Sequence, residues 1–155
     1  MKDQVRLKKL FEDHFDGDPW IEVQILASLR GLQAKDAAKN LYGLNSIWQI
    51  VHHMTCWRQT ILQRVQGKEL RSPSDNYFIV INDVSTAAWT AAVARLKKSQ
   101  TDLLAYLTND PGDLDEPAGN KYTRYELLQG LLQHDAYHLG QIVMIKKLLA
   151  LPGIQ

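Results

Sequence analysis

Hydrophobic residues recur at helical intervals in four stretches of the chain. Residues 3–15 show the spacing approximately, and three longer stretches that begin near residues 46, 86 and 123 show it clearly. In the first long stretch the apolar positions are Ile47, Ile50, Val51, Met54, Trp57, Ile61, Leu62 and Val65. Each stretch therefore predicts an amphipathic helix that buries one face.

Start and stop signals predict where these helices begin and end. A Ser-x-x-Gln sequence at Ser46 and a Thr-x-x-Glu sequence at Thr123 have the form of capping boxes, which satisfy the free amides at a helix N-terminus. Gly67 is expected to end the first of these helices, and the last one is expected to end near residues 152–153. The helix between them is predicted to run for about 20 residues from near Thr86.

The rest of the chain gives weaker signals. Asp18 and Pro19 have the form of an N-cap and a first helical residue, so a short helix is predicted from there to Gly31. Residues 32–45 have some helical character, broken by a glycine. The YFIVI run within residues 68–84 has the composition of a strand but no partner strand. We therefore predict a loop that is pinned to the core by its apolar side chains.

Together these elements predict an all-α fold, a four-helix bundle, in a single domain that spans residues 1–155. The 18 basic and 17 acidic residues give a formal net charge of +1, which supplies no broad attraction for nucleic acid or for an anionic membrane. No apolar run is long enough to span a bilayer. Neither nucleic acid nor a membrane is therefore expected as a partner.

Cysteine content and the N-terminal sequence favour a cytoplasmic protein. Cys56 is the single cysteine, so the chain has no internal disulfide. The first 15 residues, MKDQVRLKKLFEDHF, mix charged and apolar residues and lack the apolar region of a signal peptide. We therefore expect a reducing, cytoplasmic setting.

The predicted last helix carries HDAYHLGQ at residues 134–141, on or beside its apolar stripe. His134 and His138 are four residues apart, so their imidazoles lie on adjacent turns and can converge on one cation. The alternative is that each imidazole bonds an ordinary polar neighbour in the core. The pair alone leaves both interpretations open.

A third ligand would have to come from another helix, and three further histidines are available. His52 points almost opposite the apolar stripe of its helix, whereas His53 lies at the edge of that stripe, so the geometry prefers His53 without deciding the matter. His14 is expected at the surface. Cys56, one turn after His53, angles away from the apolar face and is not expected as a ligand.

The neighbours of the histidine pair have more ordinary expected roles. HDAYH is similar to the His-Glu-x-x-His motif of metalloproteases, but Asp135 is one methylene shorter than the glutamate, which disfavours a general-base role. Asp135 is therefore expected to orient an imidazole or a neighbouring helix. Tyr137 is expected to be a packing residue, and Gln141 to be a helix-surface amide.

Several motifs resemble the DinB-like family of metal-binding four-helix bundles. They are SIWQIVHHMTCW, HDAYHLGQI about 80 residues later, DPW near the N-terminus and the AAW that opens the third long helix. Each motif is short, but their order and spacing match over nearly the whole chain. The resemblance implies an up-down-down-up bundle, often a homodimer, that holds a divalent metal such as nickel or zinc on His53, His134 and His138.

The resemblance implies less about the reaction. Related branches are thiol-dependent, with transferases that use bacillithiol or mycothiol and a mycothiol-dependent maleylpyruvate isomerase, while others are described as metal-dependent hydrolases. The expected function is thus thiol-dependent S-transfer or hydrolysis of a small-molecule substrate at an open metal centre, with a low-molecular-weight thiol as a candidate cofactor. The alternative is a non-catalytic, metal-stabilised scaffold or a stress-response binding module.

Overall fold

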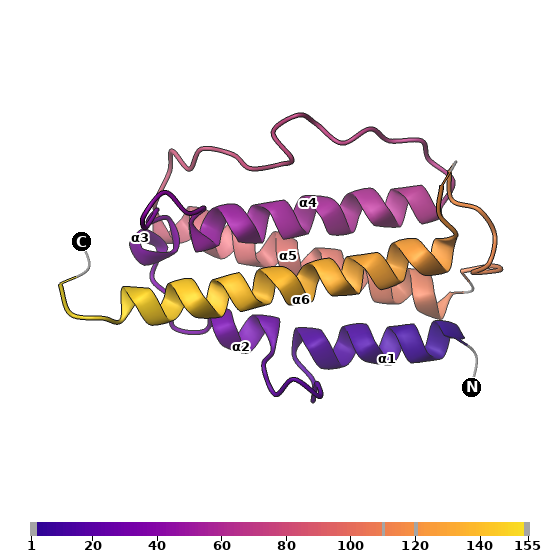
Figure 1. The fold of residues 1–155 in the computed structure, drawn as a ribbon, viewed down its shortest axis with the longest axis horizontal. Helices are drawn as coiled ribbons and strands as arrows, with labels where there is room; N and C mark the ends of the chain where they lie inside the picture. The colour runs from indigo at the N-terminus through magenta and orange to yellow at the C-terminus, as the bar shows by residue number, and fades with distance from the viewer. Residues whose placement is uncertain (1–2, 110, 120, 154–155) are drawn as a thin grey trace.

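The computed structural model describes residues 3–109, 111–119 and 121–153 (Figure 1). Within these residues the regular elements are helices, and the β-structure is one isolated bridge between Pro117 and Thr123. The helices are α1 (Asp3–Phe15), α2 (Ile25–Leu29), α3 (Ala34–Ala37), α4 (Ile47–Val65), α5 (Thr86–Thr108) and α6 (Arg124–Leu149). The all-α prediction is confirmed. None of these helices has the length and apolarity that a membrane span requires.

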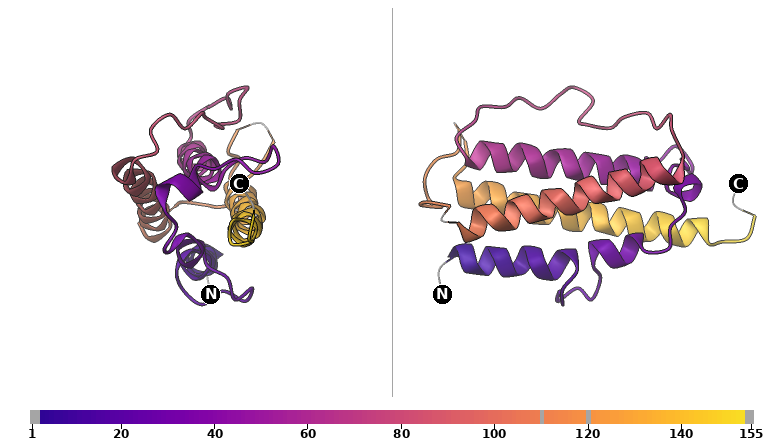
Figure 2. Two further views of the ribbon diagram at one scale, coloured as in Figure 1. Left: turned by 90° about the vertical axis from the view of Figure 1, so that its left-hand side faces the viewer. Right: turned by 180° about the vertical axis from the view of Figure 1, so that it is seen from behind.

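The four long helices form an up-down-down-up bundle. α4 packs against both α5 and α6, and α1 packs against the same two helices. α4 and α5 run in one direction, and α1 and α6 run in the other (Figures 1 and 2). Because α4 and α5 are parallel, the chain must return along the whole bundle between them, and residues 66–85 make this return along the outside.

Both predicted capping boxes are present. The Ser46 hydroxyl accepts a hydrogen bond from the Gln49 amide at 3.2 Å, and the Gln49 side chain accepts one from the Ser46 amide at 2.9 Å. Thr123 and Glu126 exchange the equivalent bonds at 3.2 and 2.7 Å. α4 and α6 therefore begin at the predicted residues, and α6 ends a few residues before the predicted Pro152.

The short helix predicted from Asp18 to Gly31 is wrong over its first half. The helix is restricted to α2, which begins six residues later than Pro19. Before it, the Glu22 amide bonds the Pro19 carbonyl at 2.9 Å, and Glu22 has a positive φ of 58°. The Gln24 side chain donates to the Gly17 carbonyl. These contacts close a tight turn, which competes with the helix that Asp18-Pro19 would otherwise start.

The YFIVI segment is a loop, as predicted. Phe78 and Ile81 are partly buried and pack against the core, whereas Val80 is 76% exposed. Phe78 and Ile81 therefore pin the return loop to the bundle without forming a strand.

The core is divided into two apolar clusters by buried polar side chains. One cluster includes Met54 and Leu96, and the other includes Leu103 and Leu128. On each long helix, at least one buried polar residue lies between residues of the two clusters. We call four of them, one from each helix, the polar layer: His14 on α1, Arg58 on α4, Gln100 on α5 and Asp135 on α6.

Candidate metal centre

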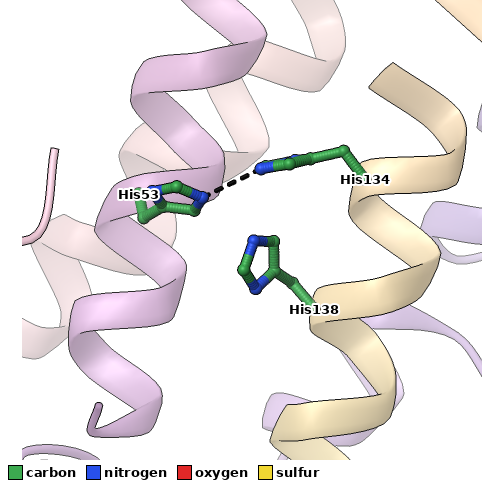
Figure 3. A group of neighbouring side chains, drawn as sticks. All are labelled: His53, His134 and His138. Carbon is green, nitrogen blue, oxygen red and sulfur yellow. Dashed lines mark hydrogen bonds between the residues drawn. The ribbon is translucent and has the colours of Figure 1, made fainter. Parts of the chain in front are cut away.

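Three histidines from two helices meet beside the polar layer (Figure 3). α4 carries His53, and α6 carries His134 and His138 on successive turns. One ring nitrogen of each residue lies within 4.8 Å of the other two. The Nε2 atoms of His53 and His134 are 2.8 Å apart. The structure therefore brings the His-x-x-x-His pair together with the third histidine that the sequence geometry preferred.

Oxygen atoms hold the outer nitrogens of two of these rings. The Nδ1 of His53 lies 2.6 Å from the Asn76 carbonyl oxygen, and the Nδ1 of His138 lies 2.7 Å from Oε1 of Gln141. These oxygens only accept hydrogen bonds, so each Nδ1 carries the hydrogen and donates it. The Nε2 of each neutral ring then presents a lone pair, as in metal-binding histidines. Gln141 is thus a partner of His138 and not the surface amide that we expected.

A hydrogen bond between His53 and His134 would leave one ring nitrogen of His134 without a partner in the part of the chain that the structure describes. Since Nε2 of His53 must accept, His134 would donate from its own Nε2. The buried Nδ1 of His134 would then be an acceptor without a donor among the described residues, at a cost of about 1–3 kcal/mol. If Nε2 of His134 faces a cation instead, its Nδ1–H lies on the side of the Asp135 carboxylate, 3.8 Å away. The three imidazoles are therefore compatible with a divalent cation.

The return loop covers the α4 side of the site. The Phe78 ring stacks on the His53 imidazole, with centroids 4.2 Å apart and planes 9° from parallel. The Trp57 indole donates to the Asn76 side chain at 3.0 Å, and the Tyr77 hydroxyl bonds the Thr60 hydroxyl at 2.9 Å. The loop therefore fixes the His53 ring from above and holds its Nδ1 partner in place.

Burial favours the neutral form of His53 and His138. Desolvation, reinforced by the neighbouring His138 and His134, lowers the pKa of His53 to about 4, against the opposing effect of the Asn76 carbonyl. Burial also lowers the pKa of His138, partly offset by its bond to Gln141. At neutral pH these rings thus keep the lone pairs that a metal ion needs, with little competition from protons.

The site is open to small molecules on one side. A hollow of about 430 Å³ lies over the histidines, and its walls include Trp57, Phe78 and Tyr137. Tyr137 is 65% exposed, and its ring centroid lies 5.0 Å from that of His138. It therefore lines the hollow and is not the packing residue that we expected. No carboxylate or cysteine side chain lines this hollow among the described residues.

His52 and Cys56 do not join the cluster. The Cys56 sulfur lies 3.4 Å from Nε2 of His52, and both residues stay outside the group of converging nitrogens. Burial raises the pKa of the Cys56 thiol, which disfavours the reactive thiolate. Cys56 therefore offers neither a ligand nor a nucleophile at this site.

Comparison with known proteins identifies the family of this fold and site. The model of the DinB superfamily matches residues 24–142, which is most of the chain and includes all three histidines. The chain belongs to the DinB superfamily. No curated protein and no solved structure matches it.

A buried ion pair supports the α6 side of the site in this DinB-superfamily chain. Arg58 Nη2 lies 2.8 Å from Asp135 Oδ2, and neither side chain has any exposed surface. The distance is that of an ion pair, although the angles fall outside those of a hydrogen bond. Arg58 also donates to Gln100 at 2.6 Å, and Gln100 donates to the Phe11 carbonyl at 2.9 Å. Asp135 thus joins α6 to α4 and, through Gln100, to α5 and α1.

The surface position predicted for His14 is wrong. His14 is 6% exposed and belongs to the polar layer, and burial is the main cause of its lowered pKa. Its Nε2 has no hydrogen-bond partner among the described residues. The approximate apolar spacing of residues 3–15 did not show that this face is buried. Arg58 and Gln100 were also missed, because a lone arginine or glutamine on a helix is usually solvated.

Loss of the Asp135 charge is predicted to destabilise the protein strongly. Asp135→Asn leaves the buried Arg58 guanidinium without a counter-charge, so we expect the free energy of unfolding to fall by about 3–5 kcal/mol. The control is Asp102→Asn, which removes an exposed pair with Lys98 and should cost less than about 1 kcal/mol. Urea unfolding measures both changes, and equal losses would show that the buried pair has no special role.

His53 is predicted to make the metal-free protein sensitive to acid. Its pKa is about 4 in the folded state and near 6.5 when unfolded, so between these values the unfolded chain binds more protons. The contribution of neutral His53 to the free energy of unfolding is therefore complete above pH 6.5. As the pH is lowered towards 4, the free energy of unfolding falls by about 3 kcal/mol. Urea unfolding in EDTA across this range measures the decline. His53→Asn should reduce it, and an unchanged slope would contradict the assignment.

Proposed function

We propose that this chain binds one divalent metal ion, zinc or nickel, through His53, His134 and His138, and that the centre catalyses thiol-dependent S-transfer onto a small molecule. The observation that supports this most is the convergence of three imidazoles beneath an open hollow. Imidazole suits both metals, and three protein ligands leave coordination positions for a guest. Hydrolysis at the same centre is the second candidate reaction.

The ligand set determines what a bound ion would contribute. A dication held by three neutral imidazoles keeps its charge, acidifies a thiol or water bound next to it and polarises a substrate oxygen. The chain's own residues hold and orient the group. Asn76 and Gln141 fix the His53 and His138 rings through their Nδ1 atoms, and Phe78 and Trp57 limit the access of bulk water.

The surroundings of the site favour a thiol over water as the nucleophile. A thiol has a pKa of about 8.5, whereas that of water is about 15.7, so a thiol needs far less acidification at neutral pH. Among the described residues the hollow has no carboxylate base to assist water, and Asp135 is fully buried against Arg58. Since Cys56 is outside the site, the thiol must come from a second molecule, a low-molecular-weight thiol of the reducing cytoplasm.

The proposed transfer requires no further co-reactant. The thiol releases its proton to solvent, and its sulfur uses the resulting electron pair to form a bond to an electrophilic carbon of the substrate. The leaving group departs with the electrons of the bond that breaks.

We also propose that the protein is a homodimer, as the resemblance to the family implies. The outer face of α6 exposes Tyr137 and Met144, each 65% accessible. A pair of large apolar side chains on one helix face is a surface that a second copy can cover. Because this face borders the hollow over the histidines, dimerisation would also restrict access to the site.

Metal binding is predicted to need all three histidines of the cluster. The metal-stripped protein should take up one equivalent of Zn²⁺ or Ni²⁺, and His53→Ala, His134→Ala or His138→Ala should weaken binding by at least about 100-fold. His52→Ala is the matched control, because it removes the neighbouring imidazole and should leave the affinity unchanged. Isothermal titration calorimetry measures both. Similar affinities for His52→Ala and His53→Ala would refute the proposed ligand set.

Thioether formation is predicted to depend on the metal. With bacillithiol or mycothiol as the thiol and 1-chloro-2,4-dinitrobenzene as the electrophile, loaded protein should release chloride and form the thioether faster than stripped protein. In cobalt-loaded protein the thiol should also alter the visible absorption spectrum. Turnover that persists after complete metal removal would exclude this mechanism. A rise in melting temperature with metal, but no turnover, would favour the non-catalytic scaffold.

A further inference from the structure

A second hollow continues from the histidine site along the groove between α4 and α6. It has a volume of about 520 Å³ and shares Trp57 and His134 with the hollow over the histidines. The two hollows are therefore adjoining parts of one surface depression. A ligand in the second hollow would have one end next to the imidazoles.

The walls of this groove are mainly apolar and aromatic. Ile61 and Leu131 are buried residues of its lining, and Tyr122 and Tyr125, also in the lining, are 44% and 37% exposed. Rings and aliphatic side chains in such an arrangement bind an apolar body by burying its surface.

Gly130 keeps the groove open. It lies in the middle of α6, where glycine weakens a helix relative to alanine. A Cβ at this position would meet no atom within 4 Å, so close packing within the chain does not require glycine. Gly130 lines the groove, and a larger side chain there would occupy space that a ligand would otherwise use.

Arg64 gives the far end of the groove a positive charge. Its Nε and Nη2 donate to the Leu70 carbonyl at 3.2 and 2.7 Å, which fixes the guanidinium, and no carboxylate among the described residues forms an ion pair with it. Glu126 is the acidic residue of this lining, and its carboxylate is engaged in the Thr123 capping box. The remaining Nη1 donors of Arg64 are therefore available to an anion.

The next hollow extends this positive region. It adjoins the groove at Arg64 and also includes Lys68, Arg71 and Lys121, together with Glu69, which forms no ion pair with another described residue. The groove therefore has an imidazole cluster at one end and an excess of positive charge at the other. Because α4 rises by about 1.5 Å per residue, the backbone of Arg64 lies about 10 Å beyond that of Trp57, and the Arg64 guanidinium reaches back to 5.5 Å from the Trp57 ring centroid.

We propose that this groove binds an elongated small molecule with an apolar body, preferably an aromatic ring, and a terminal carboxylate at Arg64. Its other end reaches the histidine site. As a description of the substrate, this inference rests on the proposed function. The binding itself does not require a bound metal, because every contact that we invoke is made by residues outside the cluster apart from the edge of His134.

Three probes of equal length test the charge preference in metal-stripped protein. 4-Phenylbutyrate should bind with a dissociation constant on the order of 1 mM, as expected for so small a ligand. The neutral 4-phenylbutanol should bind about tenfold more weakly, and the cationic 4-phenylbutylamine more weakly still. Titrations followed by amide NMR shifts measure these affinities and locate the perturbed residues. Equal affinity for the three probes would overturn the role of Arg64.

Two glycines of α6 provide a matched pair of variants for the groove. Gly130→Leu places a side chain inside the groove and should weaken 4-phenylbutyrate binding at least about tenfold. Gly140→Leu is the control, since Gly140 also has open space around its Cβ but lines a different hollow. Both variants should fold, because a Cβ at either position meets no atom within 4 Å. Similar binding by the two variants would overturn the proposal.

Two further measurements test the role of Arg64 and whether a second copy of the chain covers the groove. Arg64→Gln should abolish the preference for the carboxylate over the alcohol while retaining binding of the ring, and an unchanged preference would count against the proposal. If Gly130→Leu instead converts a dimer to a monomer by sedimentation analysis, a second copy covers the groove and the proposal is wrong. Since these assays use stripped protein, they are independent of whether the chain binds metal or turns over a thiol.

Discussion

The attraction between Arg58 and Asp135 fixes the register of α4 against α6 along the bundle axis. The histidine cluster depends on that register. Asp135 is next to His134 in the chain, and Arg58 follows His53 by five residues on α4. Two apolar helix faces tolerate sliding more readily than two buried charges do, since a displaced charge would lie in the core without a partner. A shift by one turn, about 5.4 Å, would separate the two Nε2 atoms that are now 2.8 Å apart. We therefore interpret the polar layer as the element that sets the helix register.

The topology of the bundle supplies the rest of the site. Because α4 and α5 are parallel, residues 66–85 must cross the length of the bundle, and this crossing places Asn76 and Phe78 against His53. Asn76 and Tyr77 have φ values of 52° and 63°, a region that asparagine enters readily and tyrosine does not. The loop accepts this conformation while its side chains anchor it to α4. The connection thus acts as a cover that orients a site residue.

The sequence predicts the helices and the histidine pair much better than it predicts the partners of those histidines. Helix starts depend on local signals such as the capping boxes at Ser46 and Thr123, and the His134–His138 spacing is a property of one helix. Whether His53 or His52 faces that pair depends on the packing of two helices, so the periodicity gave a preference only. The carbonyl of Asn76 and the charge of Arg58 reach the site through tertiary contacts. No pattern within the local sequence encodes contacts between residues so far apart.

The charges around the site and the groove point to the same kind of guest. Burial lowers the pKa of His53 and of His138, and Arg58 balances the charge of Asp135, so these groups supply no net negative charge against a bound dication. An anionic ligand such as a thiolate is then favoured at the centre. Arg64 favours an anion again at the other end of the groove, while the walls between the two ends are apolar. A guest with two anionic ends and an apolar middle would satisfy both electrostatic preferences, either as one molecule or as a thiolate beside a carboxylate-bearing substrate. In the second case the sulfur and its electrophile would meet between Trp57 and His134, the residues that the two hollows share.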